Sequence, residues 1–162
     1  MIALVLLVGC GAGGAPPVEN PGIINELLAV DRTGAVDEAG ELADWIELRD
    51  PTGEGLDLSG WSLYVDLDGG QAPWVLPAEA VVPAGGYALV WCDGEPTEGP
   101  LHAPFTLDHD RGDLVLLDPD GDLADEARYG LMREDTSWGR VPDGSDDWRY
   151  LVVPTPGASN GG

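Results

Sequence analysis

The chain has 162 residues and 43% of them are hydrophobic, which is enough for one domain with a buried core and too little for two. Thirty acidic residues against seven basic ones give a formal net charge of −23. Because so acidic a chain repels nucleic-acid phosphates, we expect no direct DNA or RNA partner. The 24 glycines and 14 prolines, without sustained helical periodicity in the body of the chain, favour an all-β class.

The first ten residues resemble the signal sequence of a bacterial lipoprotein. The apolar run at 2–8 is far shorter than the roughly 20 residues that span a bilayer as a helix. It ends in Leu7-Val8-Gly9-Cys10, which resembles a lipobox, whose cysteine sulfur accepts a diacylglyceryl group. No Lys or Arg precedes the run, a departure from the positive start of secretory signals that leaves the translation start open. The alternative is a buried N-terminal strand with an unrelated cysteine.

The stretch after Cys10 is rich in Gly, Ala and Pro, as in tethers between a lipid anchor and a folded domain. The sequence therefore predicts a signal peptide at 1–9, a lipidated flexible tether at 10–21 and one domain at 22–160. Lipid on Cys10 makes the membrane an expected partner. The residue after Cys10 is not the Asp that marks inner-membrane retention, so we expect the outer membrane or the cell surface. With Cys10 acylated, Cys92 lacks a disulfide partner and is expected to pack as a small apolar residue.

Alternating apolar and polar residues between Pro, Gly and Asp turns predict the strands of this domain. The bend Pro83-Ala84-Gly85-Gly86 requires a positive φ. The apolar side of the alternation predicts a core that contains Ile46, Leu48, Leu63, Leu89, Trp91 and Leu116. The strands are expected at 23–30, 44–49, 61–65, 73–76, 79–82, 87–92, 104–107, 113–118, 122–129, 136–141 and 147–152.

Several short motifs follow one another along the predicted domain. They are Ile24-Asn25-Glu26, Asp44-Trp45-Ile46-Glu47-Leu48, Asp50-Pro51, Leu58-Ser59-Gly60-Trp61, Pro83-Ala84-Gly85-Gly86, Leu101-His102-Ala103-Pro104-Phe105, Gly112-Asp113-Leu114, Ser137-Trp138-Gly139-Arg140 and Pro154-Thr155-Pro156-Gly157. Their order resembles the bacterial lamin-tail domain over most of the predicted domain. The resemblance implies an immunoglobulin-like β-sandwich and a role as an interaction module, which in that family also accompanies secreted hydrolases.

No set of residues has the spacing of a catalytic, zinc or phosphate-binding motif. His102 is interpreted as a structural or surface residue, and His109 as a residue of a hairpin loop. Two groups of oxygen donors are candidate calcium sites. The first consists of Asn25, Glu26, Asp44 and Glu47, with polar capping of the sandwich edge as the alternative. The second consists of Asp118, Asp120 and Asp122, where Pro-Asp-Gly also predicts a plain hairpin turn.

Two further motifs have a structural interpretation. Arg140, one of few cations in the chain, is expected to pair with a buried or half-buried acid such as Glu47. The tripeptide Arg111-Gly112-Asp113 has the form of an integrin ligand, but its glycine is expected to serve the geometry of a turn.

The leading hypothesis is therefore a non-enzymatic binding or structural module, held by lipid at the envelope, whose partner is an envelope or extracellular protein or a polysaccharide. The alternative is a cation-dependent carbohydrate-binding module or hydrolase that uses Trp74, Trp148 and Tyr150 beside nearby acids. A planar row of exposed aromatic rings would favour sugar binding, whereas buried rings would assign them to the core.

Overall fold

The computed structural model of the protein describes residues 22–67 and 72–161, and the predicted signal peptide, the tether and Cys10 lie outside them. The described residues form strands, turns and loops without a helix, as predicted for an all-β chain. The strands are β1 (Ile24–Leu28), β2 (Asp44–Arg49), β3 (Leu56–Asp57), β4 (Ser62–Asp66), β5 (Trp74–Val75), β6 (Val81–Val82), β7 (Tyr87–Cys92), β8 (Gly112–Leu117), β9 (Leu123–Tyr129), β10 (Ser137–Arg140) and β11 (Trp148–Leu151).

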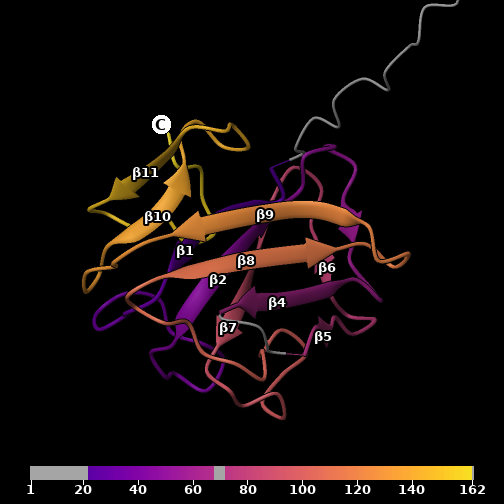
Figure 1. Cartoon of the computed structure of the whole chain (residues 1–162), viewed down its shortest axis with the longest axis horizontal. Coiled ribbons are helices and arrows are strands. Elements are labelled where there is room, and N and C mark those ends of the chain that lie inside the picture. Colours follow the sequence, from indigo (N-terminus) through magenta and orange to yellow (C-terminus); the bar gives the residue numbers. More distant parts are fainter. Residues whose placement is uncertain (1–21, 68–71, 162) are drawn as a thin grey trace, which may run out of the picture.

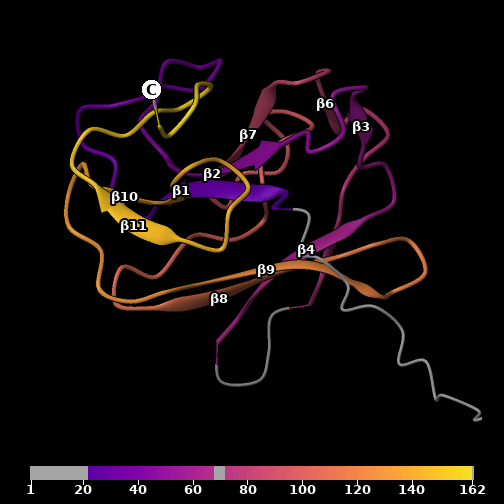
Figure 2. The same cartoon turned by 90° about the horizontal axis from the view of Figure 1, so that it is seen from above.

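Two antiparallel sheets form a β-sandwich (Figure 1). The first sheet has the strand order β11-β10-β1-β2-β7 and the second β5-β4-β8-β9, while β3 and β6 make a separate two-stranded ribbon. In the view from above, β1, β2, β7, β10 and β11 lie in one layer and β4, β8 and β9 in the other (Figure 2). Sequential hairpins such as β8–β9 and β10–β11 account for several of the neighbouring pairs.

The main core lies between the two sheets, because each strand turns one set of alternate side chains toward the other layer. Ile46 and Leu48 of β2 and Leu63 and Leu116 of the second sheet are fully buried there, as predicted. The free thiol of Cys92 also packs in this core, as expected. Burial raises its pKa well above the ordinary value, and the neighbouring carboxylates of Asp44 and Asp93 add to the rise.

A second, smaller cluster covers the outer face of the five-stranded sheet. It contains Leu28, Trp45 and Trp91, with half-buried Leu89 packed against it. The prediction that Leu89 and Trp91 fill the main core is therefore wrong: both lie on the outer face of the sheet and not on the face that meets the other sheet. In β7 it is Val90 and Cys92 that point inward, and Trp91 is buried because residues of the 31–43 loop, including Ala35 and Ala43, pack over it.

The strands differ from the predicted set at two places. β3 was not predicted, because two residues are too few to show an alternation. The predicted strand at 104–107 is a loop that buries Phe105 and Leu107 and pairs only through a bridge between Asp93 and Thr106. Alternate side chains of this loop pack in the core, as those of a strand do, but its backbone is not part of a sheet.

Two of the predicted turn positions, at Gly85 and Asp50, are turns in the structure, and a third, Gly112, is not. Gly85 has a φ of 62°, as the bend at 83–86 requires. The buried carboxylate of Asp50 accepts hydrogen bonds from the Gly85 amide (2.8 Å) and from Thr52 and the Gly55 amide, and these bonds hold its pKa below the usual range. Gly112 is not in a turn. It lies in β8 opposite Tyr129, whose ring fills the space of a Cβ atom.

Candidate functional site

Three of the four oxygen donors predicted on β1 and β2 lie on the outer face of the five-stranded sheet. Asn25, Glu26 and Glu47 are fully buried there. A β-bulge between Ile24 and Glu26 adds one residue to β1, which leaves Asn25 without a paired residue in β2. The Asn25 side-chain amide donates to Glu47 Oε1 (3.0 Å) and to Asp143 Oδ1 (3.1 Å).

The C-terminal segment, residues 154–160, closes over these side chains. The Thr155 amide donates to Glu26 Oε1 (3.1 Å), the Thr155 hydroxyl lies 2.7 Å from Glu26 Oε2, and the Gly157 amide donates to Glu47 Oε2 (2.7 Å). The Asn160 side chain donates to the carbonyl oxygens of Asn25 and Arg140 (3.2 and 3.0 Å). Buried carboxylates thus fix a segment that has no strand of its own.

The hydrogen atoms of this network can be assigned at Glu26. The Asn160 amide nitrogen donates to two carbonyls, so its oxygen is an acceptor, and the Thr155 hydroxyl lies 2.7 Å from both that oxygen and Glu26 Oε2. The Thr155 hydroxyl has one hydrogen and can donate it to only one of these two oxygens. If it donates to the Asn160 oxygen, a proton on Glu26 Oε2 supplies the hydrogen bond from Glu26 to the Thr155 hydroxyl. Burial raises the pKa of Glu26, in agreement with this assignment, although the Ser137 hydroxyl also donates to it.

The other two carboxyls of the network differ in their pKa. Burial raises the pKa of Glu47 to about 8, against the lowering effect of its bonds from Asn25 and Gly157. For Asp143, burial is outweighed by hydrogen bonds from the Tyr87 hydroxyl and the Asn160 amide, which lower its pKa. The network therefore combines acids that favour the neutral form with one that favours the anion.

The predicted cation set is only partly assembled. Asp143 takes the place that we expected Asp44 to fill, because Asp44 and Glu47 are three residues apart on β2 and side chains alternate between faces. The oxygens of Glu26, Glu47 and Asp143 already accept hydrogen bonds from the side chains and amides around them. The arrangement is a closed hydrogen-bond network that holds the C-terminal segment.

This network predicts a loss of stability between about pH 5 and 8. The unfolded chain releases the Glu47 proton near pH 4.3, whereas the folded protein keeps it up to about 8. Folding is therefore favoured at low pH, and the contribution is lost as pH rises, by about 1.4 kcal/mol per unit for one proton. We expect Glu47→Gln to flatten this dependence in urea unfolding at constant ionic strength. Glu126→Gln, at an exposed position of β9, is the control. An equally steep profile for both variants would contradict the assignment.

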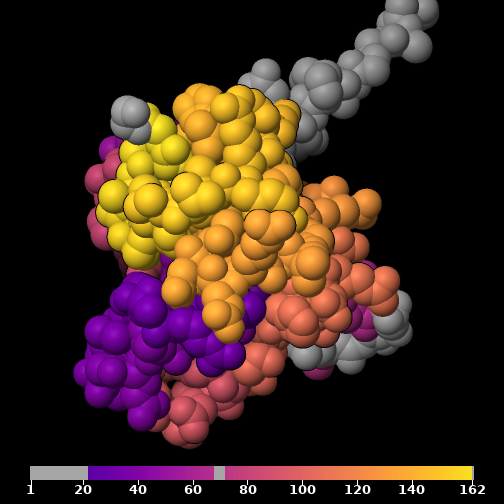
Figure 3. Space-filling model, turned by 90° about the vertical axis from the view of Figure 1, so that its left-hand side faces the viewer, coloured from indigo at the N-terminus to yellow at the C-terminus, as the bar shows by residue number. Residues whose placement is uncertain are grey.

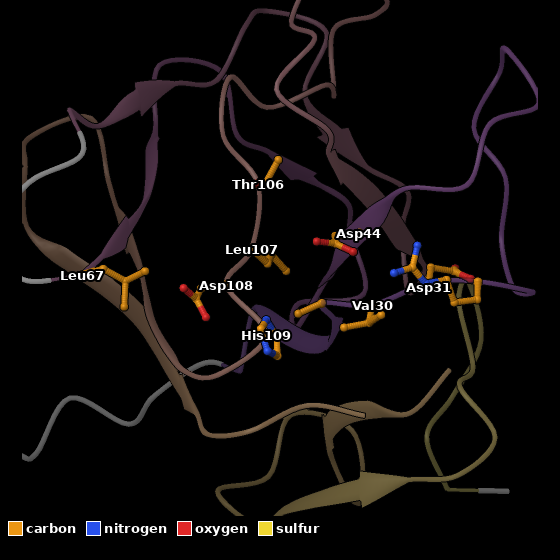
Figure 4. Close-up of a pocket in the computed structure, with 10 residues that line it drawn as sticks. Val30, Asp31, Asp44, Leu67, Thr106, Leu107, Asp108 and His109 are labelled. Atoms are coloured by element: carbon orange, nitrogen blue, oxygen red, sulfur yellow. The ribbon is translucent and has the colours of Figure 1, made fainter. Parts of the chain in front are cut away.

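Asp44 instead lines a polar hollow of about 560 Å³, together with Asp31, Asp108 and His109 (Figure 4). Burial raises the pKa of Asp44 to about 6. Asp31 is held in place because its carboxylate accepts bonds from the Gly34 amide (2.7 Å) and from the Trp45 indole (3.2 Å). His109 is exposed beside Asp108, in a loop as expected.

The surroundings of His102 were not predicted from the sequence. Its ring is 2% exposed, with Nδ1 2.5 Å from Asp93 Oδ2 and Nε2 3.1 Å from Glu38 Oε2. Burial lowers its pKa, but the bonds to Asp93 and Glu38 outweigh it and raise the pKa overall. Asp37 and Glu98 also approach the ring closely enough to share an ion with it and Asp93. His102 therefore has a structural role, as interpreted: its buried ring joins the loops that carry Asp93 and Glu38.

The acids at 118–122 form a turn. Asp118 Oδ1 accepts hydrogen bonds from the amides of Asp120 and Asp122 (both 2.9 Å), and Gly121 has a φ of 87°. Asp120 and Asp122 are exposed. Among residues 22–67 and 72–161, the groups of ligand atoms close enough to hold a metal ion include none of these three acids.

Arg140 pairs with a buried acid, as predicted, but with Asp125 and not with Glu47. It lies opposite Trp148 on the inner face of the sheet, whereas Gly139 is the residue beside Glu26. Its guanidinium bonds to Asp125 Oδ1 of β9 (2.9 Å), with both side chains fully buried, and to the Ile24 carbonyl (2.8 Å). The ion pair therefore joins the two sheets.

The aromatic residues named for sugar binding pack mainly against other rings. Trp74 is half-buried and meets Phe105 edge-on, with ring centroids 6.4 Å apart. Half-buried Trp148 stacks on Trp138 at 6.1 Å and lies under the Arg140 guanidinium at 4.6 Å. Tyr150 remains half exposed at the sheet edge, where Leu131, Val152 and Val153 are exposed as well.

Comparisons with known proteins identify no family: no family model matches the chain, and no curated protein is similar to it. Within the described part of the chain, no helix has the length and hydropathy to cross a bilayer. The fold and these sites define the chain as an all-β sandwich whose buried acids are fixed by hydrogen bonds.

Proposed function

We propose that this protein is a binding module without catalytic activity, held at the bacterial envelope by lipid on Cys10. One observation carries the binding role: exposed apolar side chains gather where β11 ends. Val152 is 83% exposed and lines one groove with Leu131 and Tyr150, and the following residue, Val153, is 73% exposed. Exposed apolar groups gathered at one place on so acidic a chain favour contact with another molecule.

The groups that would carry catalysis have structural tasks. His102 is buried between carboxylates, and Glu26 and Glu47 hold the C-terminal segment. A rigid sandwich that follows the Gly- and Pro-rich segment predicted as a tether suits presentation of a surface away from the membrane. The motif order that resembles lamin-tail domains supports the same role, since such domains serve as interaction modules.

Cell fractionation tests the proposal with the full chain and its Cys10→Ala variant. We expect the unaltered chain in the membrane pellet, resistant to a high-salt wash and extracted by detergent, and the variant in the soluble fraction. The extracted chain, incubated with native envelope in calcium or in EDTA, should retain an envelope protein or polysaccharide. The same fraction for both chains would refute the anchor, and hydrolysis of an envelope polymer by the purified chain would refute the absence of catalysis.

A further inference from the structure

The outer edge of the five-stranded sheet is an open backbone. β11 is the last strand of that sheet, and the Val141 amide donates to the Asp147 carbonyl across the hairpin (2.8 Å). Hydrogen-bonded pairs recur every second residue in an antiparallel ladder. The register Arg140↔Trp148 and Trp138↔Tyr150 then directs the backbone N–H and C=O groups of Trp148 and Tyr150 away from β10. They have no backbone partner among the described residues.

An apolar groove with one cation runs beside this edge. It has a volume of about 430 Å³ and is lined by Leu131, Arg133, Thr136, Tyr150 and Val152. Figure 3 looks onto this side of the molecule, where the orange and yellow part of the chain lies at the surface. The Tyr150 hydroxyl donates to the Leu131 carbonyl (3.2 Å), which fixes one wall of the groove.

The charge of the groove differs from that of the rest of the protein. Arg133 has no ion pair with a described residue, although the chain contains thirty acids, whereas Arg128 pairs with Asp113 and Arg149 with Asp147. A cation beside exposed apolar walls complements a ligand that carries an apolar group and a carboxylate. A second copy of the chain, with its own charge of −23, is repelled as a whole.

We propose that the edge of β11 binds an extended peptide segment of a partner protein as an added strand. An apolar side chain of that segment fills the groove between Leu131, Tyr150 and Val152, and a carboxylate two residues away pairs with Arg133. Backbone bonds to Trp148 and Tyr150 give affinity, and the groove and Arg133 give selectivity. The inference deepens the proposed binding function by naming the chemistry of its partner.

Calorimetry with the full chain in detergent tests the inference. The probe is the capped peptide Ser-Thr-Val-Thr-Glu-Thr-Val-Ser, which places Val and Glu on one face of a strand. Comparison peptides carry Lys in place of Glu, or N-methyl groups on all amides. We expect saturable binding of the first peptide, weakened at least about tenfold by Arg133→Gln or Val152→Asp. Arg128→Gln and Val75→Asp, at exposed positions of β9 and β5, are the matched controls and should leave binding unchanged.

Three results would overturn the inference: absence of binding by the Glu peptide, equal binding of the Lys or N-methylated peptide, or equal effects of test and control variants. A concentration-dependent dimer that Val152→Asp abolishes would assign the edge to a second copy and would also overturn it. These outcomes are separate from failure of the proposed function. An envelope partner that is retained equally by Val152→Asp would leave the module's binding role intact while refuting this site.

Discussion

Asp125→Ala should lower the free energy of unfolding by about 3–5 kcal/mol, the range for removing one partner of a buried ion pair. The substitution leaves the Arg140 guanidinium, fully buried, without its partner at 2.9 Å. It also removes the acceptor of the Ile24 amide (2.8 Å). Because Asp125 belongs to β9, and Ile24 and Arg140 to β1 and β10, the loss weakens the contact between the two sheets. Asp146, which is 3.4 Å from Arg140 but largely exposed, compensates little.

The matched control is Asp113→Ala, and urea unfolding compares the free energy of unfolding of the two variants. Asp113 pairs with Arg128 at the surface (3.5 Å), where such pairs contribute about 1 kcal/mol or less. The two variants thus remove an aspartate side chain from neighbouring strands. The side chain of Asp125 is buried, whereas that of Asp113 is 45% exposed. Equal destabilisation by both would show that the buried pair does not join the sheets.

Leu48→Ala should cost about 2–5 kcal/mol, as large-to-small substitutions in a core do. Leu48 is fully buried in the main core. Leu89→Ala removes the same atoms from a half-buried side chain on the outer face and should cost clearly less. Thermal and urea unfolding of the two variants compare the faces directly. A larger loss for Leu89→Ala would mean that the inward and outward faces of β7 have been exchanged.

That pair of variants also marks the limit of sequence analysis for the fold. Alternation located nearly all strands and placed Ile46, Leu48, Leu63 and Leu116 correctly, because the period of two depends only on the local chain. Alternation does not say which of two apolar faces meets the other sheet. In β7 both faces are apolar, and Trp91 is buried on the outer one because a distant loop covers it.

The candidate sites show the same limit at longer range. Asn25, Glu26 and Glu47 were named because neighbouring strands bring them together. Asp143 joins them from 118 residues away in sequence, and Glu38 reaches His102 from 64 residues away. Neither partner carries a local pattern that sets it apart from the other acids of the chain. The partner of Arg140 could not be predicted either, because the sequence does not say which face of β10 meets the second sheet, where Asp125 lies.

The mass of the N-terminal peptide of the native protein decides whether the proposed module is held by lipid on Cys10. A module held at the envelope by lipid begins at Cys10 after removal of residues 1–9. Mass spectrometry of protein extracted from native membranes should then find an N-terminal peptide that starts at Cys10 and carries a diacylglyceryl group on its sulfur. An unmodified chain that retains residues 1–9 would contradict the account.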